Sequence, residues 1–272
     1  MSDADEVADA IGVELIGRLP HGAGSGAYAV RTTDGTDAVL KIDGDESGEP
    51  SLVPALRART YPIPAVLRAG SRRGIRYELT ELVDGDPMDQ PRIEQLPAVQ
   101  RLITLQRAMG LGTGDWVEHM VTSITDGCVG YCEHAAMQSH SDQTRALLDR
   151  LRRLADARRD IEVPVGDAVH YDFSPYNVLV RDNQITGVVD WGGARLGDAA
   201  FDLVTLAFYT YDATVRDTLL AAAQESTPPD ALELYVAHMI LRQTDWSLRH
   251  DDPATAEWFA RTGEALLGRV AS

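Results

Sequence analysis

Apolar and polar positions alternate over short stretches of the first 90 or so residues, a period that predicts β-strands. The strand-like runs are 13–19, 27–33, 37–43, 64–70 and 76–85. Two of the connections carry hairpin signals. Asp34-Gly35 lies between the second and third runs, and the short basic turn 71–74 lies between the fourth and fifth. We therefore expect an antiparallel sheet in this part of the chain.

From about Ile93 the apolar positions recur at spacings of three and four, which predicts amphipathic helices. The helical segments are 93–110, 144–160, 198–211, 215–226, 229–250 and 253–270, with Pro229 at one helix start. Within this half, only the segment from about 168 to 190 is strand-like. The pattern therefore predicts an α+β fold, with a small β-rich N-lobe over 1–86 and a larger, mainly helical C-lobe over 87–272.

Composition fits a globular protein, since 44% of the 272 residues are hydrophobic. The sequence contains no apolar run of about 18 residues, and its acidic start lacks the pattern of a signal peptide. We therefore expect a cytoplasmic protein that does not cross a membrane. The net charge of −17 argues against a nucleic-acid partner and suits a cationic small molecule, although solubility or adaptation to salt would give the same charge.

Lys41 is the only lysine among 25 basic residues. A compact ammonium group beside phosphate oxygens is one role that a planar guanidinium does not fill equally well. The alternative is a lysine that simply remains at an exposed strand end.

The two cysteines, Cys128 and Cys132, form a C-x3-C-x-H pattern with His134. A structural zinc site needs more ligands than this segment offers. Because positions four apart lie on one face of a helix, we expect small residues packing on a helix rather than a metal site.

The strand-like segment from about 168 to 190 contains Asp172, Asn177 and Asp190 in that order. If 178–180 and 186–189 pair as a hairpin, Asn177 and Asp190 lie at its open end. Their side-chain oxygens are ligands that Mg²⁺ prefers. Asp172 can then accept a proton from an incoming hydroxyl, which is the division of labour in phosphoryl transfer.

This spacing resembles the catalytic loop and metal site of protein kinases. The segments 170–180 and 185–203 more specifically resemble the aminoglycoside phosphotransferase family, whose relatives are the choline, fructosamine and homoserine kinases. The matching residues are His170, Asp172, Asn177, Asp190, Trp191, Gly197, Asp198, Asp202 and Leu203. The sequence departs at Tyr171, where the family usually has glycine, and at Ser174, where histidine is common. The resemblance implies a bilobal protein-kinase-like fold.

The resemblance also implies a nucleotide site in the N-lobe. The turn with Gly22, Gly24, Ser25 and Gly26 would lie over the phosphates, and Lys41 would pair with the α- and β-phosphates. By analogy, Glu49 would orient Lys41, with Glu46 as the alternative.

Other residues follow from the same resemblance. The carbonyl of Glu81 and the N–H of Val83 would hold adenine, and Leu179 would form the floor under the ring. For Asp198 and Asp202 we expect, apart from the resemblance, a structural role, in which they cap and brace the neighbouring loop and helix.

The acceptor is expected between the catalytic loop and the C-terminal helices, where Tyr171, Asp245 and Trp246 are candidate contacts. The alternative is a helix pair with Trp246 in the core and Asp245 in water. The resemblance implies an ATP- or GTP-dependent, Mg²⁺-dependent phosphotransferase acting on a hydroxyl of a small cationic molecule, such as an aminoglycoside or another antibiotic. The alternatives are a kinase of a sugar amine or amino alcohol and a nucleotide-binding module without transfer. A protein kinase is disfavoured, because no Ala-Pro-Glu element follows Asp190. The resemblance sets no oligomeric state.

Overall fold

The computed structural model describes residues 2–19, 26–42, 48–128 and 130–270. The chain forms two compact units. The first joins Met1–Asp89 with Ser174–Ala194, and the second joins Gln90–Phe173 with Arg195–Ser272. The division of roles between residues 1–86 and 87–272 that the sequence predicts stays a prediction.

The first unit contains an antiparallel five-stranded sheet with the strand order β1-β2-β3-β5-β4. Its strands are β1 (Glu14–Arg18), β2 (Ala27–Arg31), β3 (Asp37–Ile42), β4 (Val66–Arg72) and β5 (Ile75–Glu81). Both predicted hairpins are confirmed, β2 with β3 and β4 with β5. Gly35 and Gly74 have φ values of 85° and 86° in their turns, where a side chain would strain the backbone.

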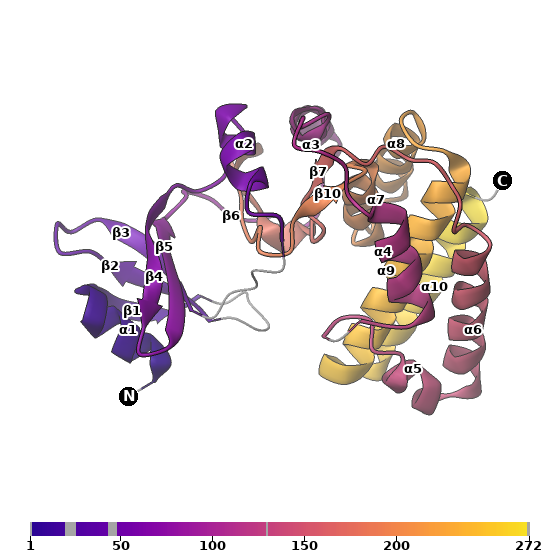
Figure 1. Cartoon of the computed structure of the whole chain (residues 1–272), viewed down its shortest axis with the longest axis horizontal. Helices are drawn as coiled ribbons and strands as arrows, with labels where there is room; N and C mark the ends of the chain where they lie inside the picture. The colour runs from indigo at the N-terminus through magenta and orange to yellow at the C-terminus, as the bar shows by residue number, and fades with distance from the viewer. Residues whose placement is uncertain (1, 20–25, 43–47, 129, 271–272) are drawn as a thin grey trace. The chain divides into compact units, whose positions relative to one another are not determined.

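Helix α1 (Asp3–Ile11) covers one face of this sheet (Figure 1). Ser2 forms a capping box with Asp5 at its start, and Gly12 ends it in the left-handed conformation. Alternate β3 residues, including Leu40, are buried in the core with α1. Because side chains alternate along a strand, Lys41 faces the opposite side of the sheet.

A second sheet of the first unit has the order β6-β8-β9. Its strands are β6 (Asp86–Pro87), β8 (Val178–Arg181) and β9 (Gln184–Val188), and the unit also contains α2 (Leu52–Ala58) and the 3₁₀ turn η2 (Pro175–Asn177). The hairpin predicted for this segment is confirmed. Asp182 and Asn183 both have positive φ, as the tight turn of a two-residue hairpin requires.

The second unit is mainly helical. Its helices are α3 (Leu96–Gln106) after the 3₁₀ turn η1 (Ile93–Gln95), α4 (Trp116–Thr125), α5 (Ala135–His140), α6 (Asp142–Asp156), α7 (Ala200–Phe208), α8 (Ala213–Gln224), α9 (Pro229–His250) and α10 (Pro253–Val270). Strands β7 (Asp167–Val169) and β10 (Arg195–Gly197) form a short antiparallel pair. Helix α9 packs along α10 and also contacts α4 and α6, so most of its residues are buried (Figure 1). The predicted start at Pro229 is confirmed.

The prediction that Cys128 and Cys132 share a helix face is wrong. Helix α4 ends at Thr125, and Gly127 and Gly130 have positive φ values that turn the chain back on itself. The two cysteines instead form an antiparallel bridge, with N–H···O distances of 3.0 and 3.1 Å. Among the described residues, no helix combines the length and apolar character needed to cross a bilayer.

Candidate active site

Lys41 and Asp190 meet in the first unit. The Lys41 Nζ lies 3.1 Å from Asp190 Oδ1, and the side chains are 24% and 52% exposed. An ion pair this exposed contributes little to stability, so its interest lies in where it places the ammonium and the carboxylate. Asp190 has a φ of 69°, a conformation that aspartate adopts more readily than most residues.

Asn177 lies beside Asp190 because of the β8–β9 pairing. Val178 is opposite Val188, and the Val189 N–H donates to the Asn177 carbonyl at 2.9 Å. The prediction that Asn177 and Asp190 share the open end of the hairpin is thus confirmed. Both side chains carry oxygen atoms of the type that hard divalent cations take as ligands.

Trp191 anchors the residue next to Asp190. Its ring N–H donates to the Val188 carbonyl at 3.0 Å, and its ring packs edge-on against Tyr61 with the centroids 5.2 Å apart. This packing limits how far the Asp190 backbone can move.

The predicted pair between Lys41 and Glu49 is not formed in this structure. The Glu49 carboxylate accepts hydrogen bonds from the hydroxyl and N–H of Ser51, at 2.6 and 3.2 Å, and these bonds lower the pKa of Glu49. Ser51 therefore turns the carboxylate toward the start of α2, while Lys41 pairs with Asp190. The alternative, Glu46, lies outside the described residues.

The segment before α2 is nevertheless tied to the loop after Asp190. The N–H groups of Gly48 and Glu49 donate to the carbonyls of Gly192 and Ala194, at 2.7 and 2.6 Å. A Cβ on Gly48 would lie 2.6 Å from both carbonyl oxygens, so only glycine allows this approach.

Val83 and Leu179, two of the predicted adenine contacts, come together over Gly187. A Cβ on Gly187 would lie 2.9 Å from Val83 Cγ1 and 3.5 Å from Leu179 Cδ1, so the missing side chain makes room for both. Glu81, the third predicted contact, ends β5, and its N–H donates to the Ala65 carbonyl at 2.9 Å.

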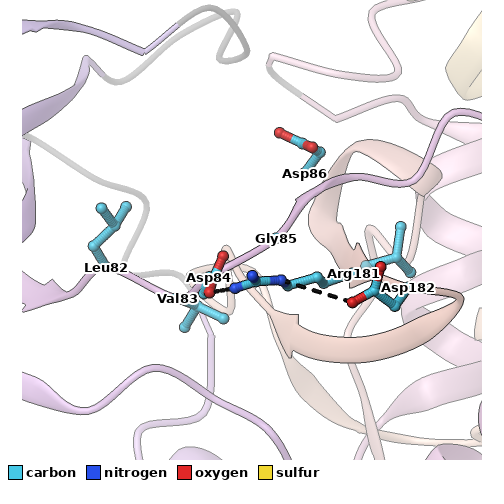
Figure 2. Close-up of a pocket in the computed structure, with 8 residues that line it drawn as sticks. Leu82, Val83, Asp84, Gly85, Asp86, Arg181 and Asp182 are labelled. Carbon is cyan, nitrogen blue, oxygen red and sulfur yellow. Dashed lines mark ion pairs between the residues drawn. The ribbon is translucent and has the colours of Figure 1, made fainter.

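Val83 also lines a hollow of about 510 Å³ (Figure 2). The lining residues are Leu82, Val83, Asp84, Gly85, Asp86, Val180, Arg181 and Asp182. The Arg181 guanidinium pairs with Asp84 and lies 3.9 Å from Asp182 within it.

The predicted phosphate turn lies only partly within the described structure. Gly24 and Ser25 are outside the described residues. Gly26 precedes β2, and its carbonyl accepts a hydrogen bond from the Ile42 N–H at 3.3 Å. The Tyr28 ring covers Gly26 so closely that a Cβ there would lie 2.4 Å from a ring carbon.

Asp172 lies in the second unit, in a loop that leaves β7 and is braced by Asp202. The Asp202 carboxylate accepts hydrogen bonds from the N–H groups of His170 and Tyr171 at 2.8 and 3.1 Å, and from Gln106 Nε2 at 2.6 Å. Burial raises the pKa of Asp202 to about 7, against these three bonds, which favour the carboxylate.

Asp198 caps α7 by accepting from the Ala200 N–H at 2.9 Å. Its other oxygen accepts from the Tyr235 hydroxyl, also at 2.9 Å. The predicted capping and bracing roles of Asp198 and Asp202 are therefore confirmed.

Tyr171 adopts a backbone conformation that favours glycine. Its φ is 73°, which accounts physically for the glycine that is usual in the resembling family. The ring is only 5% exposed and stacks on Phe201. Its hydroxyl lies 2.9 Å from the Nε2 atoms of both His119 and His238, and 3.3 Å from the Tyr131 hydroxyl. So little of Tyr171 is exposed that it offers an acceptor almost no surface.

The two histidines at the Tyr171 hydroxyl are neutral at pH 7. Burial, helped by the charge of Arg195, lowers the pKa of His119 to about 4. Burial likewise lowers the pKa of His238 well below its ordinary value. Burial raises the pKa of Tyr131 to about 12. A neutral imidazole has one donor and one acceptor, so the Tyr171 hydroxyl can donate to one ring and accept from the other.

Arg242 on α9 contacts the loop that carries Asp172. Its Nη2 lies 2.9 Å from Asp172 Oδ1, and its Nη1 donates to the Tyr171 carbonyl at 2.6 Å. No sequence signal points to Arg242, which is one of 24 arginines and lies 70 positions from Asp172.

The predicted acceptor contacts Asp245 and Trp246 lie on α9. Asp245 is fully buried, where it accepts from Arg249 Nη2 at 2.8 Å and from the Glu133 N–H at 3.0 Å. Trp246 is half-buried and stacks on His250, with ring centroids 4.0 Å apart. The burial of Asp245 leaves its carboxylate facing protein groups rather than solvent.

The fold places the chain in a known class. Its backbone is similar to that of a thermostable mutant of aminoglycoside phosphotransferase APH(4)-Ia, crystallised with ADP and hygromycin B, with a TM-score of 0.71, 21% identity and coverage of 100% of this chain and 99% of that one. It is also similar to the macrolide 2'-phosphotransferase MphH from Brachybacterium faecium, with a TM-score of 0.56, 19% identity and coverage of 96% and 98%. The predicted kinase-like α+β fold is confirmed.

The sequence itself gives the family. The model of the phosphotransferase enzyme family matches residues 16–235, and the chain belongs to this family, as predicted. A hygromycin-B 4-O-kinase from Escherichia coli is 25% identical in an alignment of length 167 that covers 54% of this chain. The match spans 48% of that relative, about half its length.

Proposed function

We propose that this protein transfers the terminal phosphate of ATP, with GTP as the alternative donor, to a hydroxyl group of a cationic antibiotic, and that the acceptor is an aminoglycoside. The observation that carries the proposal is the cluster of Lys41, Asp190 and Asn177, in which the Lys41 Nζ lies 3.1 Å from Asp190 Oδ1. Family membership and the partial match to a hygromycin-B 4-O-kinase support it.

Each predicted residue has a role in this proposal. Asp172 accepts the proton of the acceptor hydroxyl, and Lys41 binds the nucleotide phosphates. Asn177 and Asp190 hold Mg²⁺, which when bound neutralises negative charge on the phosphates. The remaining nucleotide contacts are Gly24, Ser25, Gly26, Glu81, Val83 and Leu179.

The charge of the chain supports a cationic acceptor. With a net charge of −17, the protein attracts a polyamine-like molecule over distances of a Debye length. An acceptor bearing several amino groups gains most from this field, and binding should weaken as salt is added.

The test is the release of ADP or GDP, with Mg²⁺ present, against separate pools of aminoglycosides, macrolides and amino alcohols. Asp172→Asn keeps the size of the side chain and should lower transfer on the order of 10²–10⁴-fold, the usual worth of a positioned general base. Asp160→Asn, at an exposed position in the second unit, is the matched control and should leave transfer unchanged.

Nucleotide binding is measured separately, as the rise in melting temperature when ATP is added. It should persist in Asp172→Asn. ADP or GDP release with the amino alcohols alone would mean that the acceptor is a metabolite rather than an antibiotic. Binding of ATP with no release in any pool would contradict the proposed transfer.

A further inference from the structure

Arg242 joins two consecutive residues of the loop that carries the proposed base. One of its terminal nitrogens donates to the Tyr171 carbonyl at 2.6 Å, and the other lies 2.9 Å from Asp172 Oδ1. The five N–H donors of a guanidinium are fixed in one plane, so these two contacts set the carbonyl and the carboxylate relative to each other.

The guanidinium is built into the interior of the second unit. Only 13% of its side chain is exposed, against 38% for Asp172. Its Cζ lies 5.2 Å from the centre of the Tyr171 ring and 5.7 Å from that of Tyr131. Burial is the largest single effect on the pKa of Arg242 and lowers it, but the surrounding groups, with the Asp172 charge first among them, together raise the pKa above its ordinary value, so the guanidinium stays charged.

The peptide between Tyr171 and Asp172 needs such support. A non-glycine residue at a φ of 73° is strained by about 1–2 kcal/mol. Asp202 on α7 holds the N–H side of Tyr171, and Arg242 on α9 holds its carbonyl side. The conformation that aims the Asp172 side chain is therefore fixed from two helices.

We propose that Arg242 is a positioning residue for Asp172: it holds Oδ1 and the preceding carbonyl, and this sets the direction in which the carboxylate meets the acceptor hydroxyl. The inference rests on the proposed function, in which Asp172 is the base. A base displaced by about 1 Å loses on the order of 10²-fold in rate, and this is the expected size of the effect.

The experiment compares Arg242→Gln and Arg242→Lys with wild type and with Asp172→Asn in the ADP-release assay. Arg242→Gln should lower kcat about 100-fold and leave the KM values for nucleotide and acceptor within about twofold. Arg242→Lys keeps the charge but cannot make both contacts in one plane, so its kcat should lie between those of Arg242→Gln and wild type. Arg158→Gln is the matched control, because Arg158 is a similarly buried arginine that pairs with Glu233 at the other end of α9.

A second measurement separates positioning from simple loss of structure. Added methylguanidine should restore part of the kcat of Arg242→Ala and none of that of Asp172→Asn. Near-ultraviolet circular dichroism checks that each variant folds. If Arg242→Gln or Arg242→Ala fails to fold, Arg242→Lys still tests the idea through its kcat.

The outcomes separate the two proposals. Wild-type enzyme that releases no ADP with any acceptor contradicts the proposed function itself. Wild-type kcat in a folded Arg242→Gln or Arg242→Lys, while Asp172→Asn is inactive, overturns the Arg242 inference alone. A raised KM with unchanged kcat also overturns it, because it would assign Arg242 to binding.

Discussion

Mild acid should destabilise the protein through His119. This residue on α4 has its Nε2 2.9 Å from the Tyr171 hydroxyl, and its ring lies 6.3 Å from that of Trp116. The groups that act on its charge are Arg195, which disfavours the proton, and Asp115, which favours it less strongly. Burial is the largest effect, and together these lower the pKa of His119 from 6.5 to about 4.

The sign of the effect follows from this pKa. Between pH 6.5 and 4 the unfolded chain binds a proton at His119 that the folded chain does not. The stability that His119 contributes is therefore complete above about pH 6.5 and is lost as the pH falls toward 4. The full shift is worth about 3 kcal/mol, and acidification from pH 7 to pH 5 removes about 2 kcal/mol of it.

The assay is urea unfolding at pH 7 and pH 5, followed by tryptophan fluorescence, for wild type, His119→Gln and His140→Gln. His140 is exposed at the end of α5 and serves as the matched control. Wild type and His140→Gln should each lose about 2 kcal/mol more on acidification than His119→Gln does. The pKa of Asp202, raised by burial to about 7, gives the opposite slope, since its contribution is complete below pH 3.8 and is lost as the pH rises through 7. That contribution is common to the three proteins and cancels in the comparison.

Equal losses in wild type and His119→Gln would refute the reasoning. They would mean that His119 is protonated as readily in the folded protein as in the unfolded chain. A reduced loss in His140→Gln would show that the measurement reports histidine content rather than burial.

Two further predictions concern Tyr171 and Lys41. Tyr171→Gly relieves about 1–2 kcal/mol of backbone strain but empties the space of a buried ring, which costs about 3–5 kcal/mol, so thermal unfolding should show a net loss of about 1–4 kcal/mol. Tyr171→Phe keeps the ring and should lose less; a Tyr171→Gly variant as stable as wild type would contradict the packing argument. Lys41→Met keeps the length of the side chain without its charge and should raise the Kd for ATP about tenfold in calorimetry, or about 1.4 kcal/mol. An unchanged Kd for ATP would mean that Lys41 does not bind the nucleotide phosphates.

The tertiary structure corrected two predictions that rested on residues close together in the sequence. Cys128 and Cys132 have a helical spacing, but Gly127 turns the chain just before Cys128, and Gly130 turns it between the two cysteines. The predicted pair of Lys41 with Glu49 is not formed. Ser51, two positions after Glu49, donates to the Glu49 carboxylate, and Lys41 pairs with Asp190 instead.

Short-range order was determined by the sequence itself. The hairpins follow from alternation and from turn residues, such as Asp34-Gly35, that accept unusual φ values. Asn177 and Asp190 flank one such hairpin, so local pairing alone brings them together. Only the tertiary structure decided that Arg242 reaches Asp172 and that the Tyr171 hydroxyl lies between His119 and His238. These contacts join residues 52 to 70 positions apart, and they depend on how whole helices pack, which no local period or spacing encodes.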